Sequence, residues 1–246
     1  MIKSIIISFF FALFLSGCAT FYTVTYEFNQ DVMSGNYALA EQLLEKNKKF
    51  KKPKNVLLYY MNKGYVLRQQ NKFTESNVYF NKADLYIEDQ TRNVGKEALA
   101  IITNDGVRAY KADGFESLMI HYYKALNYMA LNNTEGALVE VKRMDLMIEQ
   151  LSSEEKKVTR KLPEEYGFIQ NLMGVVYEAS GDYNNAFISY RNSYNNYKES
   201  EVKVPNQLKK DLLHAASATG FNGEFRMYGK EVGFNHDSTL YSSQQA

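Results

Sequence analysis

The chain contains one cysteine, Cys18, and the residues before it give this thiol a chemical role. Lys3 is followed by an apolar run from Ile5 to Phe14, and two small residues stand directly before the cysteine. A basic start, a short apolar stretch and small residues at a cleavage point are typical of a secretory signal peptide. The apolar run is shorter than the about 20 residues that a membrane-spanning helix needs. The sequence therefore predicts that residues 1–17 form a signal peptide, with an uncleaved helix and an ordinary secretory signal as the alternatives.

The segment Leu15-Ser16-Gly17-Cys18 resembles the lipobox of bacterial lipoproteins. The resemblance implies a diacylglyceryl thioether on Cys18 and, after cleavage, a further acyl chain such as palmitate on its amine. Two or more acyl chains hold a protein stably on a bilayer. We therefore expect a protein of the cell envelope in which residues 18–23 are a lipidated tether. Ala19 is not the aspartate that retains lipoproteins in some inner membranes, which favours the outer membrane, facing the periplasm.

The rest of the sequence contains no pattern that is typical of catalysis. His121, His214 and His236 are not paired at metal-ligand spacing, and a single cysteine cannot build a zinc site. Neither a nucleophile elbow nor a phosphate-binding loop occurs. We therefore expect no catalytic residue, no metal and no cofactor. His121 is expected to be a packed core residue.

Small and aromatic residues recur along the chain at a spacing that predicts helical hairpins. In one copy Gly174 is followed by Tyr177, Gly181, Tyr183, Ala186 and Tyr190. This copy resembles the tetratricopeptide repeat, in which two antiparallel helices are joined by a tight turn. Small residues at Gly174 and Ala186 would let the two helices approach closely, the three tyrosines would fill the space between them, and Gly181 would form the turn.

Three further copies follow the same template. One is centred on Gly64 with Asn71 at the turn, another on Ala125 with Asn132 at the turn, and a weaker one contains Gly35 and Ala40. The three prolines, Pro53, Pro163 and Pro205, each stand just before a periodic apolar segment, where the first turn of a helix tolerates proline. The resemblance departs from a regular array, because the chain has no tryptophan and the copies are not evenly spaced by about 34 residues.

These observations predict an all-α chain with three parts after the signal peptide. The tether, residues 18–23, leads into a TPR-like superhelix of antiparallel hairpins over residues 24–230, and residues 231–246 are expected to be a disordered tail. An inserted helical segment is expected between the second and third repeats, at residues 91–116, either as a binding face or as structural filler. Charged residues 150–163 are expected to be a helix extension and a loop.

Charge gives two further expectations. Removing residues 1–17 removes Lys3 and no acidic residue, so the mature chain carries equal numbers of basic and acidic residues, which argues against nucleic-acid binding. Six lysines are concentrated between Lys46 and Lys54. They are interpreted either as a contact for anionic headgroups near the lipidated end or as a solvated loop between the first two hairpins, and the balanced charge elsewhere favours the loop.

In the tetratricopeptide repeat the first helix of each hairpin lines a concave groove, and this resemblance implies the candidate binding residues. They are methionine, tyrosine and other large side chains, of types that adapt well to protein partners, and about half of them are expected to pack on neighbouring repeats. The set is Leu58, Met61, Tyr65 and Arg68 from one copy, Met119, Tyr122 and Met129 from the next, and Phe168, Asn171 and Glu178 from the last.

A wider resemblance supports this interpretation. The run from Tyr122 to Leu131, with Glu140 to Arg143 downstream, looks like an uncharacterised family of bacterial tetratricopeptide lipoproteins, and the similarity covers most of residues 25–220. It implies a non-enzymatic scaffold that is held to the membrane through Cys18 and binds an envelope protein or peptide. By analogy of architecture, such a scaffold serves envelope assembly or regulates peptidoglycan synthesis. An envelope enzyme with a helical cradle and a spacer with no specific ligand are the alternatives.

Overall fold

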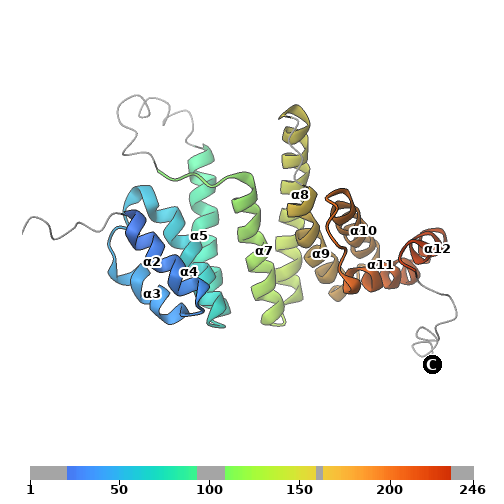
Figure 1. The fold of residues 1–246 in the computed structure, drawn as a ribbon, viewed down its shortest axis with the longest axis horizontal. Coiled ribbons are helices and arrows are strands. Elements are labelled where there is room, and N and C mark those ends of the chain that lie inside the picture. Colours follow the sequence, from blue (N-terminus) through green and yellow to red (C-terminus); the bar gives the residue numbers. More distant parts are fainter. Residues whose placement is uncertain (1–20, 93–108, 159–162, 234–246) are drawn as a thin grey trace, which may run out of the picture. The chain divides into compact units, whose positions relative to one another are not determined.

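The computed structural model describes residues 21–92, 109–158 and 163–233, and these residues form ten α-helices, one short 3₁₀-helix and no strand (Figure 1). This confirms the predicted all-α class. The chain divides into two compact units, residues 1–112 and 113–246. The signal peptide, Cys18 and most of the expected tail lie outside the described residues.

The first unit consists of two helical hairpins. Helices α2 (Phe21–Met33) and α3 (Tyr37–Lys46) form the first hairpin, and α4 (Val56–Gln69) and α5 (Phe73–Arg92) form the second. The 3₁₀-helix η1 (Pro53–Asn55) leads into α4. The core between them is built from seven buried apolar residues, namely Val24, Phe28, Ala40, Leu44, Phe50, Tyr59 and Val66.

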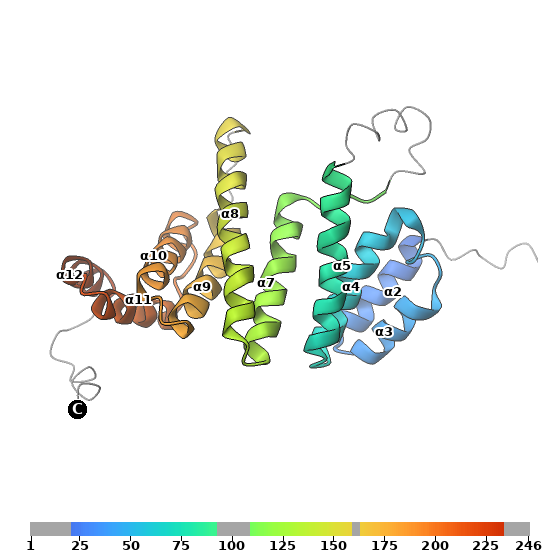
Figure 2. The ribbon, with the colours of Figure 1, turned by 180° about the vertical axis from the view of Figure 1, so that it is seen from behind.

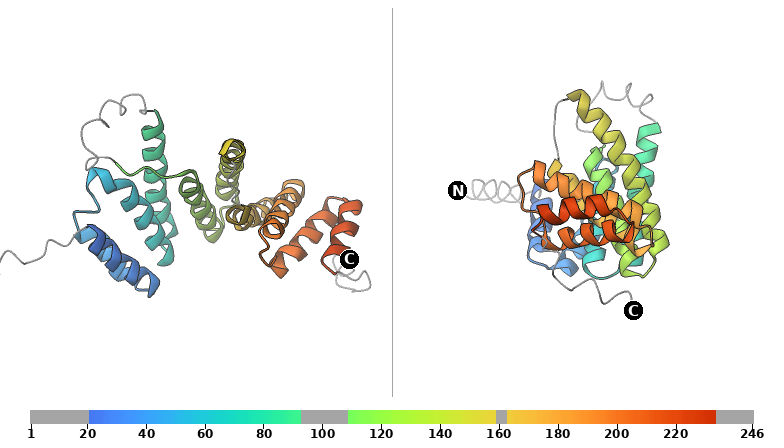
Figure 3. Two further views of the ribbon diagram at one scale, coloured as in Figure 1. Left: turned by 45° about the horizontal axis from the view of Figure 1, so that its top comes forward. Right: turned by 90° about the vertical axis from the view of Figure 1, so that its right-hand side faces the viewer.

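The second unit contains three hairpins in sequence. They pair α7 (Gly114–Ala130) with α8 (Thr134–Val158), α9 (Pro163–Ala179) with α10 (Tyr183–Glu199), and α11 (Asn206–Ala218) with α12 (Asn222–Glu231). Figures 2 and 3 show α9, α10, α11 and α12 following one another side by side. One continuous core of buried residues, from Leu118 on α7 to Tyr228 on α12, holds the three hairpins together.

The turn of every hairpin contains one residue with left-handed backbone. Gly35, Asn71, Asn132 and Gly181 have φ of +74°, +60°, +55° and +80°, in agreement with the four turns that the repeats predict. Glycine has no Cβ to clash in this conformation, and asparagine tolerates it better than most residues. Gly220 forms a fifth turn with φ of +74°. After this turn the sequence predicts one or two further helical turns at residues 224–230, and these residues lie in α12, a helix of 10 residues.

The small residues of the repeats stand where the paired helices are closest. A Cβ on Gly64 would lie 2.8 Å from the ring of Phe80, and one on Gly174 would lie 2.4 Å from the ring of Tyr190. Ala186 is fully buried. These contacts confirm the predicted close approach of the helices. Tyr183 differs from the prediction: it is the first residue of α10, it is 37% exposed, and its ring meets that of His214 on α11 with centroids 6.0 Å apart.

The bounds of several segments differ from those that the sequence predicts. Residues 21–23 belong to α2 and not to the tether, because the ring of Phe21 packs on Phe50 and Val24 is buried. The insert expected at residues 91–116 ends before Asp113, because Asp113 and Glu116 form a capping box that starts α7. The rest of the expected inserted helix, within residues 93–108, lies outside the described residues. Helix α8 extends to Val158, which confirms the expected helix extension.

Candidate protein-binding surface

The predicted binding residues of the first unit form one stripe along α4. Leu58, Met61, Tyr65 and Arg68 are spaced by three and four residues, which places them on one side of a helix, and all four are partly exposed. We call them the α4 stripe. Tyr65 packs on the core of its unit with one part of its ring. Burial and the nearby Tyr37 raise the pKa of Tyr65, so its hydroxyl is uncharged at physiological pH. The stripe offers an apolar surface with one cation, Arg68.

The predicted residues of the second unit come from two neighbouring hairpins. Met119, Tyr122 and Met129 lie on α7, and Phe168, Asn171 and Glu178 lie on α9, and together we call them the α7–α9 stripe. The rings of Tyr122 and Phe168 meet edge to face with centroids 5.2 Å apart, and Phe115 approaches Phe168 at 6.5 Å. The first helices of two hairpins therefore contribute to a single aromatic surface. None of the six residues is fully buried.

Several members of the α7–α9 stripe also contribute to packing. Met119, Tyr122, Met129 and Phe168 lie against the buried core of the second unit while part of each side chain remains exposed. This agrees with the expectation that only part of the predicted set is free for a partner. Asn171 differs from them, because its Oδ1 atom is buried and accepts no hydrogen bond from the described residues.

Glu178 has a structural role that the sequence did not indicate. The hydroxyl of Tyr190 donates a hydrogen bond of 2.6 Å to one carboxylate oxygen, and Nδ1 of His214 lies 2.7 Å from the other. These contacts join α9, α10 and α11, so Glu178 is less available to a partner than the other members of the stripe. They also place His214 at a junction between helices.

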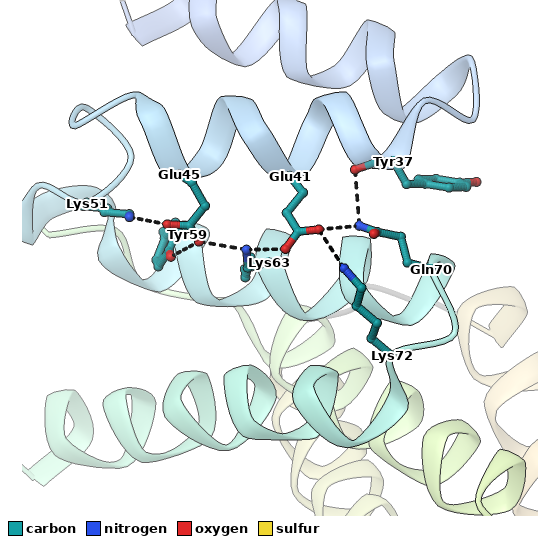
Figure 4. Close-up of polar contacts among 8 residues, drawn as sticks. All are labelled: Tyr37, Glu41, Glu45, Lys51, Tyr59, Lys63, Gln70 and Lys72. Carbon is teal, nitrogen blue, oxygen red and sulfur yellow. Dashed lines mark hydrogen bonds and ion pairs between the residues drawn. The ribbon is translucent and has the colours of Figure 1, made fainter.

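A network of charged side chains joins the two hairpins of the first unit (Figure 4). Lys63 of α4 is 5% exposed, and its Nζ lies 2.7 Å from Glu41 and 2.8 Å from Glu45, both on α3. Gln70 and Lys72 also bond to Glu41, and Lys51 and Tyr59 bond to Glu45. A lysine can be buried at this depth because two carboxylates pair with it.

The network sets the ionisation of its acids. Burial opposes ionisation of Glu41, but the hydrogen bonds from Lys63, Gln70 and Lys72 outweigh it and lower the pKa to about 2. In the same way burial is outweighed at Glu45 by hydrogen bonds from Lys51, Lys63 and Tyr59, which lower its pKa to about 2. Both carboxylates are therefore charged throughout the physiological range and hold Lys63 in place.

A second buried cluster lies inside the first hairpin of the second unit. Glu140 of α8 is 4% exposed, and its two carboxylate oxygens lie 2.7 Å from Nδ1 of His121 and 2.9 Å from Nζ of Lys124. Burial would raise the pKa of Glu140, but the contacts with His121 and Lys124 lower it overall. His121 is 5% exposed, which confirms its predicted place in the core.

The sequence did not select Lys63, Lys124 or Glu140 as candidate site residues. One signal was present, because Lys63 directly precedes Gly64 and Lys124 directly precedes Ala125, the small residues of two repeat copies. Lys63 pairs with acids on α3 of the preceding hairpin, whereas Lys124 pairs with Glu140 on α8, the partner helix of its own hairpin. Both clusters join helices by ion pairs. The cluster of His121, Lys124 and Glu140 is buried, whereas the Lys63 network reaches the surface at Glu45, Lys51 and Lys72.

The described residues were also compared with the requirements of a metal site and of a membrane-spanning helix. Among residues 21–92, 109–158 and 163–233, no three histidine, cysteine or acidic side chains are grouped so that they could hold a metal ion. Within those ranges no helix has both the length and the apolar character that crossing a membrane requires.

The fold is similar to that of a solved protein. The crystal structure of BtubC (BKLC) from P. vanneervenii matches with a TM-score of 0.57 and 13% sequence identity, over 86% of this chain and 78% of that one. At this identity the similarity concerns the fold alone. No family model and no curated protein matches the chain.

Proposed function

We propose that this chain is a lipoprotein of the bacterial cell envelope, anchored through Cys18, that binds a partner protein along its helical hairpins. The hairpins are taken to be TPR-like repeats arranged as a superhelix, without enzymatic activity. The outer membrane, facing the periplasm, is the proposed location, and assembly of the envelope or regulation of peptidoglycan synthesis is the proposed process.

The observation that carries the proposal is the contact between Tyr122 and Phe168. It joins the first helices of two hairpins into one partly exposed aromatic surface, and it does so between residues that the sequence pattern had selected for binding. Aromatic residues at such surfaces commonly supply most of the energy of a protein interface. The exposed parts of Met119 and Met129 extend this surface with side chains that adapt to different partners.

Two further features favour a TPR-like scaffold. Gly35 and Asn71, the turn residues of the first two hairpins, are separated by close to one repeat length, about 34 residues. The buried ionisable clusters around Lys63 and Glu140 are used to hold helices together, which favours a binding protein over an enzyme with a helical cradle.

The test compares partner capture with stability in the mature chain. Tyr65→Ala and Tyr122→Ala are expected to weaken capture of one stoichiometric envelope protein while the chain stays folded. Ala186→Leu is expected to lower the stability by about 1–3 kcal/mol, because it forces extra carbon atoms into a fully buried helix contact. Leu146→Ala, at a 62% exposed residue of a second helix, is the control that should change neither property.

The outcome also separates the alternatives. A spacer without a specific ligand would capture no stoichiometric partner in any of these forms. If the tyrosine variants melt as low as Ala186→Leu and still capture the partner when folded, these residues belong to the core and the proposed binding surface is wrong.

A further inference from the structure

The segment from the last residue of α3 to η1 carries a dense positive charge. Lysines occupy six of the positions from Lys46 to Lys54, and no acidic residue lies among them. We call this segment the lysine loop. Lys46, Lys48 and Lys52 are exposed, and none of the ion pairs found in the described part of the chain involves them. Lys51 pairs with Glu45, which is also neutralised by Lys63.

Contacts inside the first unit fix the position of this loop. Phe50 is fully buried, and its ring lies 5.7 Å from that of Phe21 and 5.9 Å from that of Phe28. The side chain of Asn55 donates a hydrogen bond of 2.8 Å to the carbonyl of Lys49. The lysine loop is therefore held against the first turn of α2, and Figure 2 shows the loop passing that end of the helix.

This placement brings the charge close to the proposed lipid anchor. Only Ala19 and Thr20 stand between Cys18 and the start of α2 at Phe21, so the chain can span at most about 11 Å there. An acylated Cys18 would keep the lysine loop close to a bilayer surface, where the field of anionic lipids is felt over about 8 Å. Tyr22 is 78% exposed next to Phe21, and tyrosine is favoured at membrane interfaces.

We propose that the lysine loop binds the anionic headgroups of the bilayer that carries the Cys18 anchor, with Tyr22 at the same interface. The lipid and the loop then act as two membrane contacts at one end of the first unit, and they orient that unit with the start of α2 toward the membrane. One acyl chain gives only marginal binding, whereas one chain plus a basic patch gives stable binding. The orientation rests on the proposed lipid anchor, but the affinity of the loop for anionic lipid can be measured without cellular lipidation.

The experiment uses the mature chain, residues 18–246, with a single myristoyl-length chain attached chemically to the thiol of Cys18. Its partition is measured onto vesicles of phosphatidylcholine and onto vesicles that contain one third phosphatidylglycerol. The wild-type chain should bind the anionic vesicles more than tenfold more tightly, and 1 M salt should remove the difference. Replacing Lys46, Lys48 and Lys52 by glutamine should weaken anionic binding by up to about fivefold per lysine and leave binding to phosphatidylcholine unchanged.

The matched control removes the same charge from the second unit by replacing the exposed Lys203, Lys210 and Lys230 by glutamine. It should bind like the wild type. Equal binding of the wild type to both kinds of vesicle, or equal losses in the two triple variants, would overturn the proposal. Because the acyl chain is attached chemically, these outcomes do not depend on lipidation in cells or on partner capture, which test the proposed function separately.

Discussion

Gly174 and Tyr190 are so close that a methyl group on Gly174 would lie 2.4 Å from two carbon atoms of the tyrosine ring. The hydroxyl of the same tyrosine donates a hydrogen bond to Glu178, one turn further along α9. Tyr190 is therefore held at both its ring and its hydroxyl by α9, and its side chain is buried. This contact sets the distance between α9 and α10.

Gly174→Ala should lower the free energy of unfolding by about 1–3 kcal/mol, because the added carbon overpacks a close helix contact. Gly223→Ala is the matched control, since nothing lies within 4 Å of its Cβ position and it also belongs to a helix. The control should be neutral or stabilising by up to about 1 kcal/mol. Chemical unfolding followed by circular dichroism measures both, and an equally stable Gly174→Ala protein would show that the contact is loose.

The repeat pattern predicted much of this geometry from sequence because small residues and turn residues have local requirements. Gly64, Gly174 and Ala186 were recognised from spacing alone, and the turn residue Asn71 from its tolerance of left-handed backbone. The hairpin of α11 and α12 was anticipated only in part, because the two glycines Gly220 and Gly223 suggested a break followed by no more than one or two helical turns at residues 224–230.

The candidate site was predictable only in part. The resemblance to the tetratricopeptide repeat, in which the first helix of each hairpin lines the groove, implied the residues of the α4 stripe and of the α7–α9 stripe. The contact of Tyr122 with Phe168 depends on how α7 packs beside α9, and no local pattern encodes that. The pairing of Lys124 with Glu140 joins residues on two different helices. Charged residues do not recur at a regular spacing along these helices, so the sequence pattern does not predict the pair.

The first unit should lose stability in acid through Glu41 and Glu45. Their pKa values are lowered from 4.5 to about 2 in the folded chain, so their stabilising effect is fully present above about pH 4.5 and is lost as the pH falls toward 2. Glu41→Gln should flatten this dependence, whereas Glu27→Gln, at an exposed residue of α2, should leave it unchanged. Urea unfolding at pH 7 and at pH 3 measures the change in the free energy of unfolding. An equal loss of stability in the wild type, Glu41→Gln and Glu27→Gln would contradict the role of the network.

Glu140→Gln should be strongly destabilising, by about 3–5 kcal/mol, because it leaves the buried Lys124 without its carboxylate. Glu149→Gln, at an exposed residue of the same helix, is the control and should change little. A Lys124→Met, Glu140→Leu double variant should recover most of the loss, since apolar residues of similar size can replace a buried pair. Thermal melts of the four proteins decide it, and a mild effect of Glu140→Gln would mean that water reaches Lys124.

Cys18→Ser should abolish incorporation of labelled palmitate and leave an uncleaved precursor, because a hydroxyl cannot take the place of the lipid-accepting thiol. Ser16→Thr keeps the cysteine and is the control that should still incorporate the label. Growth with radiolabelled palmitate followed by gel electrophoresis gives the answer. Equal labelling of the wild type and Cys18→Ser would exclude this residue as the anchor.

The most direct measurement of the proposed binding surface is photo-crosslinking in intact cells. A photoreactive phenylalanine analogue is placed at Tyr65, at Tyr122 and, as the control, at Leu146, which is exposed on the second helix of its hairpin. We predict that Tyr65 and Tyr122 crosslink to the same envelope protein and that Leu146 does not. No crosslink from either tyrosine, or the same products from all three positions, would contradict a partner bound along the first helices.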